Sequence, residues 1–399
     1  MFVDRIYMDN AATTRVTEPV FEAMRPYFGE IYGNPMSVHS FGREARKGVE
    51  EARRQVAAAL NAEPSEIYFT GCGTESDNWA IRGAAYANLR KGKHLITTQI
   101  EHHAVLHTCE QLEREGFNVT YLPVDEFGVV RMDALKAAIR PDTTLISVMA
   151  ANNEIGTIQP IEEIAKLAKE RGILFHTDAV QAIGSLPFDV KAMGIDLLSL
   201  SGHKFHAPKG VGALYIRNGV RLQRLIQGGA QERTQRAGTE NVASIVGLGK
   251  AIELAAGNID RHNAQLATVR DRLIDRILAE IPYTRLNGHR TQRLPGNCNI
   301  SFRFIEGESL LLALDLKGIA GSSGSACTSG SLDPSHVLLA IGLPHEIAHG
   351  SLRLSLSEEN TIEQADRVVD ALKEIVARLR SMSPLYDDFL REGENEGQN

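Results

Sequence analysis

A lysine set between two histidines is the first feature of this sequence that could do chemistry. Lys204 lies in "SGHKFHAPKG", directly after an apolar run, and His203, His206 and Lys209 are close to it. A lysine amine attacks carbonyl groups once its pKa is depressed, and nearby cations or desolvation depress it. Lys204 is therefore a candidate for forming a Schiff base, although a solvated surface lysine is the commoner role.

Short apolar runs along the first two thirds of the chain predict the strands that position this lysine. Helical patterns separate the runs, and one of them, residues 160–172, ends at Gly172, a typical residue after a helix C-terminus. This alternation predicts an α/β protein with a mostly parallel sheet. The predicted strands are residues 66–70, 94–98, 144–150, 173–177, 196–201 and 212–216.

Polar stretches follow five of these runs in succession. In open α/β sheets, ligands bind outside the carboxyl ends of the strands. One polar ending is weak evidence, because many strands end this way, but five in succession favour a binding site. The five endings read "GCGTESDN", "EHHAV", "ANNEIG", "DAVQ" and "SGHK".

These endings hold candidates for every part of a pyridoxal phosphate site, which needs a lysine, a partner for the pyridine nitrogen, a phosphate cradle and often a stacked ring. Asp178 could hold the pyridine nitrogen protonated, or it could simply cap the next helix. Gly73 and Thr74 lie where a helix opens, and helix N-termini favour phosphate. His102 could lie flat on the ring and act in catalysis by moving protons, or it could be structural.

The pattern changes from about residue 260 onward. Two amphipathic helices, predicted within residues 263–281 and 365–382, flank two strand-like stretches and indicate a smaller α+β domain. The last residues are polar and predict a disordered tail. The expected units are a large cofactor-binding domain over 16–258, a small domain over 1–15 and 259–390, and a tail over 391–399.

Composition argues against several classes of partner. The 399 residues include 43 Lys and Arg against 50 Asp and Glu, and the net charge of −7 gives no attraction to nucleic acid or to anionic membranes. No stretch is apolar for long enough to span a bilayer, and the N-terminus carries early charges, so we expect a cytoplasmic protein. The cysteine spacing predicts neither a disulfide framework nor a metal site.

The motifs, taken together and in order, resemble the NifS/IscS-type cysteine desulfurases, which are pyridoxal phosphate enzymes with the class V aminotransferase fold, fold type I. The resemblance runs from about Tyr7 to about Ser357. "TGCGTESDN", "HAPKG" and "RAGTEN" are most similar to the nitrogen-fixation branch of this family. The motifs that carry the resemblance are "YMDNAATT", "YGNPMSVHSFG", "TESDN", "EHHAVLHTC", "ANNEIGT", "FHTDAVQAIG", "LSGHKFHAPKGVGALY", "RAGTEN" and "SSGSACTSGSLDPSHV".

The resemblance implies a role for each matching residue. Lys204 would hold pyridoxal phosphate as a Schiff base, Asp178 would pair with the pyridine nitrogen and His102 would stack on the ring. Arg353 would bind the substrate carboxylate, for which a guanidinium fork is well suited. The further cofactor residues would be Gly73, Thr74, Asn153, Gln181, Ser201, His203 and, reaching the phosphate of a partner subunit, Thr239; the further substrate residues would be Asn34 and Asn153.

Cys327 distinguishes the possible reactions. It lies in a Gly- and Ser-rich stretch, "GSSGSACTSGS", that is typical of a mobile loop. A thiolate there could act as a nucleophile, although a solvent-exposed loop cysteine without a chemical role is also possible. The resemblance implies that Cys327 takes the sulfur of L-cysteine as a persulfide and leaves L-alanine. It also implies a homodimer and an iron-sulfur scaffold protein as acceptor, with a link to nitrogenase. The alternatives are an aminotransferase, a selenocysteine lyase or a non-catalytic docking adaptor.

Overall fold

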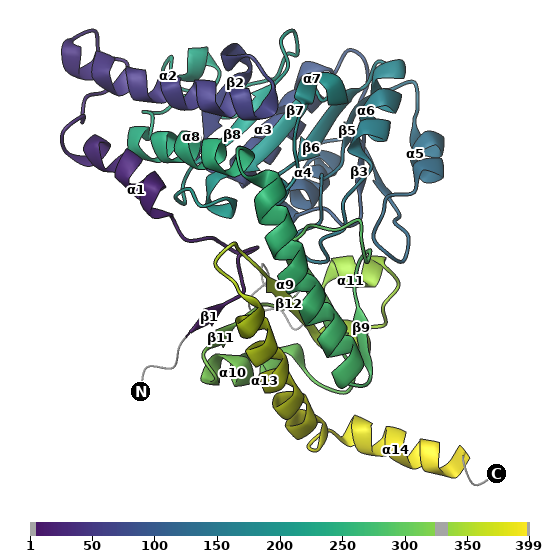
Figure 1. The fold of residues 1–399 in the computed structure, drawn as a ribbon. Helices are drawn as coiled ribbons and strands as arrows, with labels where there is room; N and C mark the ends of the chain where they lie inside the picture. The colour runs from purple at the N-terminus through teal and green to yellow at the C-terminus, as the bar shows by residue number, and fades with distance from the viewer. Residues whose placement is uncertain (1–4, 324–333, 397–399) are drawn as a thin grey trace.

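A seven-stranded sheet forms the centre of the larger part of the chain in the computed structural model, which describes residues 5–323 and 334–396 (Figure 1). The strand order is β2-β8-β7-β6-β5-β3-β4. Neighbours from β7 to β4 pair in parallel, whereas β8 is antiparallel to β2 and β7. The predicted α/β class with a mostly parallel sheet is therefore confirmed. The strands are β2 (Ile67–Thr70), β3 (His94–Thr98), β4 (Asn118–Leu122), β5 (Thr143–Ser147), β6 (Leu174–Asp178), β7 (Leu197–Ser201) and β8 (Gly212–Ile216).

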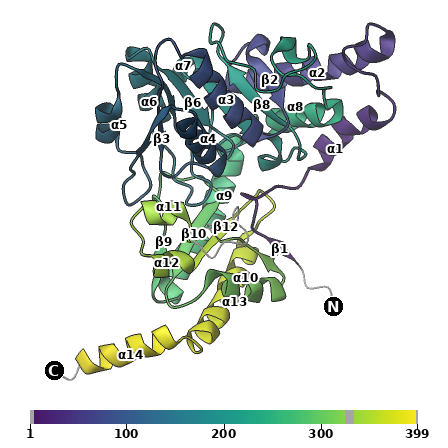
Figure 2. The same cartoon turned by 180° about the vertical axis from the view of Figure 1, so that it is seen from behind.

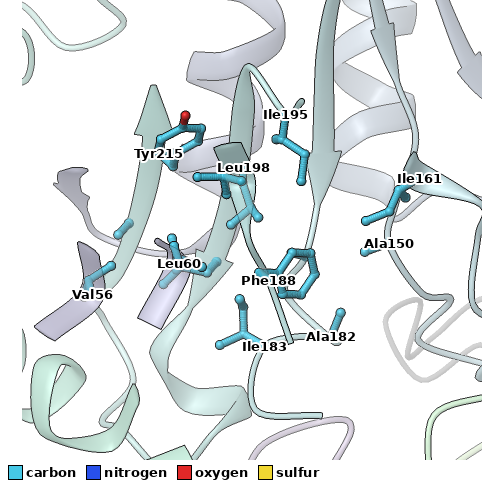
Figure 3. Packing of buried hydrophobic residues seen from close by; sticks show 14 of the residues in the cluster. Val56, Leu60, Ala150, Ile161, Ala182, Ile183, Phe188, Ile195, Leu198 and Tyr215 are labelled. Carbon is cyan, nitrogen blue, oxygen red and sulfur yellow. The ribbon is translucent and has the colours of Figure 1, made fainter. Parts of the chain in front are cut away.

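Helices cover both faces of this sheet, which is why its central strands are buried on both sides. On one face, α2, α6 and α8 pack against the sheet through a large core whose members include Leu60, Phe188 and Leu198 (Figure 3). On the other face, α3 and α4 bury Trp79 and Val105. The helices of this part are α1 (Glu18–Met24), α2 (Ser40–Leu60), α3 (Gly73–Ala87), α4 (His103–Arg114), α5 (Met132–Ala138), α6 (Ile161–Glu170), α7 (Val190–Met193) and α8 (Val242–Ala256), with the 3-10 turns η1 (Arg25–Phe28), η2 (Pro64–Glu66), η3 (Gly202–Lys204) and η4 (Glu232–Thr234).

A second core lies below the sheet in Figure 1 and contains α9 and α13. Leu273 of α9 and Leu372 of α13 are fully buried in it, on the apolar helix faces that the sequence predicts. Ile6 and Met8, from the other end of the chain, belong to the same core. Its elements are β1 (Ile6–Tyr7), α9 (Ile259–Glu280), β9 (Thr284–Leu286), β10 (Asn297–Phe302), α10 (Gly307–Leu316), β11 (Ile319–Ala320), β12 (Ser351–Ser355) and α13 (Ile362–Arg380).

The change of core occurs between α8 and α9, which meet at an angle of 74°. The two strand-like stretches that the sequence predicts are β10 and β12, which pair antiparallel, and β9 adds a third strand to this small sheet. The short strand β1 pairs in parallel with β11. The chain thus begins in the second core and then enters the first.

Helix α11 (His336–Ala340) lies at the junction between the two cores in both views (Figures 1 and 2), and α12 (His345–His349) follows it, as Figure 2 shows. Val337 and Leu338 of α11 are fully buried. They share a small apolar cluster with Ile100, Met149 and Ile155, which follow β3 and β5. The chain from the second part of the sequence therefore packs here against the edge of the large sheet.

The C-terminal helix α14 (Pro384–Glu396) extends past residue 391, the start of the predicted tail. Aromatic packing explains the helix, because the ring of Phe389 lies 4.9 Å from that of Phe304 and 5.2 Å from that of Tyr283. In the described part of the chain, no single helix is both long and apolar enough to cross a membrane, whereas the bent pair α8 and α9 passes that test only jointly.

Candidate active site

Lys204 ends the 3-10 turn η3 that follows β7, at the carboxyl edge of the large sheet. Its Nζ donates hydrogen bonds to the carbonyl oxygens of Ala11 and Ala12, at 2.6 Å and 2.9 Å. The amide of Gln181 donates to the same Ala11 oxygen at 2.9 Å. The N-terminal segment therefore lies at the edge of the sheet. It contacts Lys204 and Gln181, two of the residues that the family resemblance assigns to the cofactor.

Asp178 is the last residue of β6, which pairs with β7, so it lies at the same edge of the sheet as Lys204. It is 5% exposed, and one carboxyl oxygen accepts the N–H of Val180 at 2.8 Å. Burial raises the pKa of Asp178, whereas the backbone hydrogen bond and the charge of Lys204 lower it. A buried carboxylate of this kind is stabilised by a cation, and a protonated pyridine nitrogen would supply one.

His102 is the N-cap residue of α4, directly after β3 and its connecting turn. Its Nδ1 accepts the N–H of Ala104 at 3.1 Å, which fixes the orientation of the ring. Burial first, and then the charge of Lys204, lowers the pKa of His102 to about 4. The imidazole is therefore neutral at physiological pH, as a ring stacked on a cofactor would need to be if it is to avoid a buried charge.

A phosphate cradle lies between the start of α3 and the end of β7. The hydroxyl oxygen of Ser201 is buried and has no hydrogen-bond partner among the described residues. A Cβ added at Gly73 would lie 3.2 Å from Ser201 Cβ and 2.7 Å from Val180 Cγ2, so only glycine fits there. No described side chain caps α3, and Thr74 is exposed in its first turn.

Free helix N–H groups and an unpaired buried hydroxyl are what a phosphate would bind. His203 lies beside them in η3, where its Nδ1 is 3.2 Å from Thr13 Oγ1. Burial, followed by the charges of Lys204 and Lys209, lowers the pKa of His203 to about 4. The residues present therefore fit pyridoxal phosphate at its phosphate, at its ring and at its lysine.

Arg353 reaches this edge from the other core. It lies in the middle of β12, is 2% exposed, and donates to the carbonyl oxygen of Asn153 at 3.0 Å and to the carboxylate of Asp9 at 3.2 Å. Its Nε has no hydrogen-bond partner within the described residues. Arg353 is thus held in place by two groups while one donor stays available, which suits a residue that binds a carboxylate.

Two predicted site residues, Asn34 and Thr239, do not join this cluster, and a third falls outside the described part of the chain. Asn34 is exposed in the loop before α2, and its side chain accepts the N–H of Met36 at 2.9 Å, as in an ordinary turn. Thr239 is exposed in the loop between η4 and α8. Cys327 lies outside the described residues.

The contact residues Asp9, Ala11 and Ala12 were not among the predicted site residues. They follow the short strand β1, and the stretch "MDNAATT" that contains them carried the family resemblance but suggested no chemistry by residue type. No local pattern marks Asp9 as the partner of a buried arginine that lies 344 residues later in the chain.

Comparison with known proteins agrees with this geometry. The family described as aminotransferase class-V matches residues 6–368. The cysteine desulfurase IscS of Methanosarcina thermophila is 63% identical over 380 residues, which cover 95% of this chain and 94% of that protein.

Two solved structures are also similar to this chain. One is described as a NifS-like protein, with 41% identity and a TM-score of 0.89 over 94% of this chain and 100% of that one. The other is described as SspA in complex with cysteine, with 40% identity and a TM-score of 0.79 over 89% and 100% of the two chains. The chain therefore belongs to the class-V aminotransferase family, among the cysteine desulfurases of the NifS/IscS type.

Proposed function

We propose that this protein is a pyridoxal phosphate-dependent cysteine desulfurase, which converts L-cysteine to L-alanine and takes the sulfur onto Cys327 as a persulfide. The observation that carries the proposal is the meeting of Lys204 and Arg353 at one segment, residues 9–12, which contacts both. A lysine for the cofactor and an arginine for a carboxylate are thereby placed side by side. The desulfurase relatives, and the related structure described with cysteine, support L-cysteine as the substrate.

Each residue has a task that its surroundings support. Ser201, His203 and the first turn of α3 would hold the phosphate of the cofactor, while Asp178 would keep its ring nitrogen protonated. When bound, the cofactor supplies an electron sink for the negative charge that develops at the substrate Cα. Arg353 would orient the substrate carboxylate, and the amine of Lys204 would take the proton from Cα.

The sulfur step balances without an added oxidant. The thiolate of Cys327 attacks the substrate sulfur, a sulfur–sulfur bond forms, and the Cβ–S bond breaks with its electron pair moving to the substrate carbon. Proton delivery to that carbon completes L-alanine. The sum is one cysteine thiol plus L-cysteine giving one persulfide plus L-alanine. Because only thiolate is nucleophilic, the rate depends on the ionised fraction of Cys327.

Four finer points belong to the same proposal. A homodimer would allow Thr239, which is exposed in a loop, to reach the phosphate site of the partner subunit. An iron-sulfur scaffold protein would accept the sulfur, and the resemblance of "HAPKG" and "RAGTEN" to the nitrogen-fixation branch suggests a link to nitrogenase. The cytoplasm is the compartment that the sequence predicts.

The products in solution test the proposal. Purified protein loaded with pyridoxal phosphate would be incubated with L-cysteine and a thiol, and alanine, sulfide and keto acids would be measured. We expect alanine and sulfide in equal amounts, and loss of both in Cys327→Ala. A keto acid in place of alanine would indicate an aminotransferase, and full activity of Cys327→Ala would indicate a lyase that needs no persulfide. The absence of any product or bound cofactor would indicate an adaptor.

A further inference from the structure

The described residues on either side of Cys327 are both anchored at the substrate side of the site. On the upstream side, Ser322 forms a bridge with the backbone of Arg353, with hydrogen bonds of 3.0 Å and 2.6 Å. On the downstream side, the hydroxyl of Ser335 donates to the carboxylate of Glu154 and accepts the N–H of Leu338 at 3.2 Å, which caps α11. Ser322 thus contacts Arg353 directly, and Ser335 contacts the residue after Asn153, which itself accepts a hydrogen bond from Arg353.

Glu154 is itself held firmly. It is 5% exposed, its N–H donates to Asn152 Oδ1 at 2.9 Å, and its carbonyl oxygen accepts the side-chain amides of Asn297 and Asn299 of β10, at 3.1 Å and 3.0 Å. The residue before it, Asn153, accepts the guanidinium of Arg353 through its carbonyl oxygen. One dipeptide thus contacts the substrate-binding arginine through its first residue and α11 through its second.

The burial of this carboxyl group has a cost that packing alone does not explain. Burial raises the pKa of Glu154 to about 7, and the hydrogen bond from Ser335 and the charge of Arg353 offset this only in part. An apolar residue of similar size would avoid the cost of burying a carboxylate. The carboxyl group is therefore more readily explained by a directed contact, and its contact outside its own loop is Ser335.

A second hydrogen bond places α11 on the same edge. Nε2 of His336 contacts the carbonyl oxygen of Glu101 at 3.0 Å, directly after β3. Val337 and Leu338 then pack against the apolar cluster after β3 and β5. The start of α11 is consequently held against the segments that follow β3 and β5. The hydrogen bond between Glu154 and Ser335 is the contact that lies nearest to Arg353, since Asn153 contacts Arg353.

We propose that Glu154 is a positioning residue for sulfur transfer, which fixes the downstream anchor of the Cys327 segment relative to Arg353 through its hydrogen bond with Ser335. The inference rests on the proposed desulfurase function, because it concerns the formation of a persulfide on Cys327. It assigns Glu154 no role in cofactor binding. It predicts that breaking this contact slows the formation of the persulfide on Cys327. Binding of the cofactor and of L-cysteine should stay nearly unchanged.

The experiment compares Glu154→Gln, Ser335→Ala and Ser335→Thr with the wild-type holoenzyme. Persulfide on Cys327 would be followed by mass spectrometry in single turnovers over a range of L-cysteine concentrations. We expect the limiting rate to fall about tenfold in Glu154→Gln and in Ser335→Ala, with the half-saturating concentration changed less than about twofold. Ser335→Thr keeps a hydroxyl and should recover most of the rate.

Two further measurements separate positioning from a general loss of structure. The matched control is Glu66→Gln, another carboxyl group that is 4% exposed but lies in the η2 turn, where it accepts the N–H groups of Glu63 and Asn218; it should keep the wild-type rate. Hydrogen exchange of the amides in α11 should become faster in Glu154→Gln and Ser335→Ala, while exchange in β7 stays unchanged. The double variant should be no slower than Ser335→Ala, because both changes act on one contact: Gln keeps an acceptor but loses the carboxylate charge that strengthens the bond, and Ala removes the donor.

The outcomes distinguish the inference from the function on which it rests. A wild-type protein that forms no persulfide contradicts the proposed function itself. An active wild type with wild-type rates in both Glu154→Gln and Ser335→Ala overturns the positioning role. A slow Glu154→Gln beside a normal Ser335→Ala overturns it as well, because the effect would then not pass through Ser335.

Discussion

The cofactor side and the substrate side of this site are built in different ways. On the cofactor side, Asp178 and Ser201 end the neighbouring strands β6 and β7, so the register of one sheet sets their separation. On the substrate side, Arg353 comes from β12 in the other core and is held by Asp9 and by the backbone of Asn153. The separation of Asp178 and Ser201 is thus set within one sheet, whereas the position of Arg353 depends on how the two cores meet.

Removal of Lys204 should have the largest effect, because it removes the group that defines the cofactor side. In Lys204→Ala we expect the alanine-forming rate to fall by about 10³-fold or more, since both the bond to the cofactor and the proton carrier are lost. The measurement is alanine release, together with the visible absorbance of the bound cofactor. The matched control, Lys191→Ala, removes an exposed lysine paired with Glu63 and should behave as wild type. Near-normal turnover by Lys204→Ala would contradict the assignment of the cofactor side.

Replacement of Arg353 should separate the two sides. In Arg353→Gln we expect the KM for L-cysteine to rise at least about 30-fold, because a charge-assisted contact with the carboxylate is lost. Cofactor absorbance should not change, since the cofactor side belongs to the other core. Arg353→Lys keeps the positive charge but loses the paired donors of the guanidinium, so its KM for L-cysteine should lie between those of the wild type and Arg353→Gln. Loss of bound cofactor in Arg353→Gln would show that the two sides are not independent.

A smaller effect, on thermal stability, should follow from breaking the ion pair between His206 and Glu358. This pair joins the segment after Lys204 to the segment after β12. Nε2 of His206, two residues after Lys204, lies 3.2 Å from the carboxylate of Glu358, which follows β12. Burial alone would lower the pKa of His206, but the hydrogen bond and the charge of Glu358 outweigh it, so the pKa is raised. The hydrogen bond from His206 lowers the pKa of Glu358 to about 2.

The sign of the pH dependence follows from these two shifts. The raised pKa of His206 stabilises the fold below the ordinary histidine pKa of about 6.5, and that contribution is lost as the pH rises through the raised value. The lowered pKa of Glu358 contributes above about pH 4.3 and is lost in acid. The wild type should therefore exceed Glu358→Gln in melting temperature most clearly between the ordinary pKa values of the carboxyl and the imidazole, with the difference fading as the pH rises through the raised pKa of His206.

Thermal unfolding across this pH range would measure the difference. Glu51→Gln, which breaks an exposed pair with Arg54 inside α2, provides the control and should show no such trend. A difference between wild type and Glu358→Gln that does not vary with pH would show that the pair does not link the two parts in the way described.

The sequence was most informative where a single sheet decides the outcome. The predicted strands 94–98 and 212–216 coincide with β3 and β8, and the predicted ends of β6 and β7 bring Asp178 and Lys204 to one edge. β3 and β8 are buried along their whole length, and each carries a short run of apolar residues that the sequence shows clearly. β4 was missed, because its residues are mostly exposed or half-buried and its polar and apolar residues are mixed.

Contacts between distant parts of the chain could not be predicted from local patterns. Nothing in the residues around Asp9 or Glu154 shows that the first pairs with Arg353 and the second with Ser335, because each pair is more than a hundred residues apart and meets only where the cores join. The family resemblance supplied Arg353 as a substrate residue, but not the groups that hold it. The packing of α11 on the large sheet likewise follows from tertiary contacts alone.

The most direct test of the account is peptide mass spectrometry of the holoenzyme after exposure to L-cysteine, with a parallel sample reduced by borohydride to make the bond between lysine and cofactor permanent. We predict the cofactor on the peptide that contains Lys204 and one additional sulfur atom on the peptide that contains Cys327, with alanine in solution. Cofactor on another lysine, or sulfur on Cys72, Cys109 or Cys298 at the same rate while the Cys327 peptide stays unmodified, would contradict it.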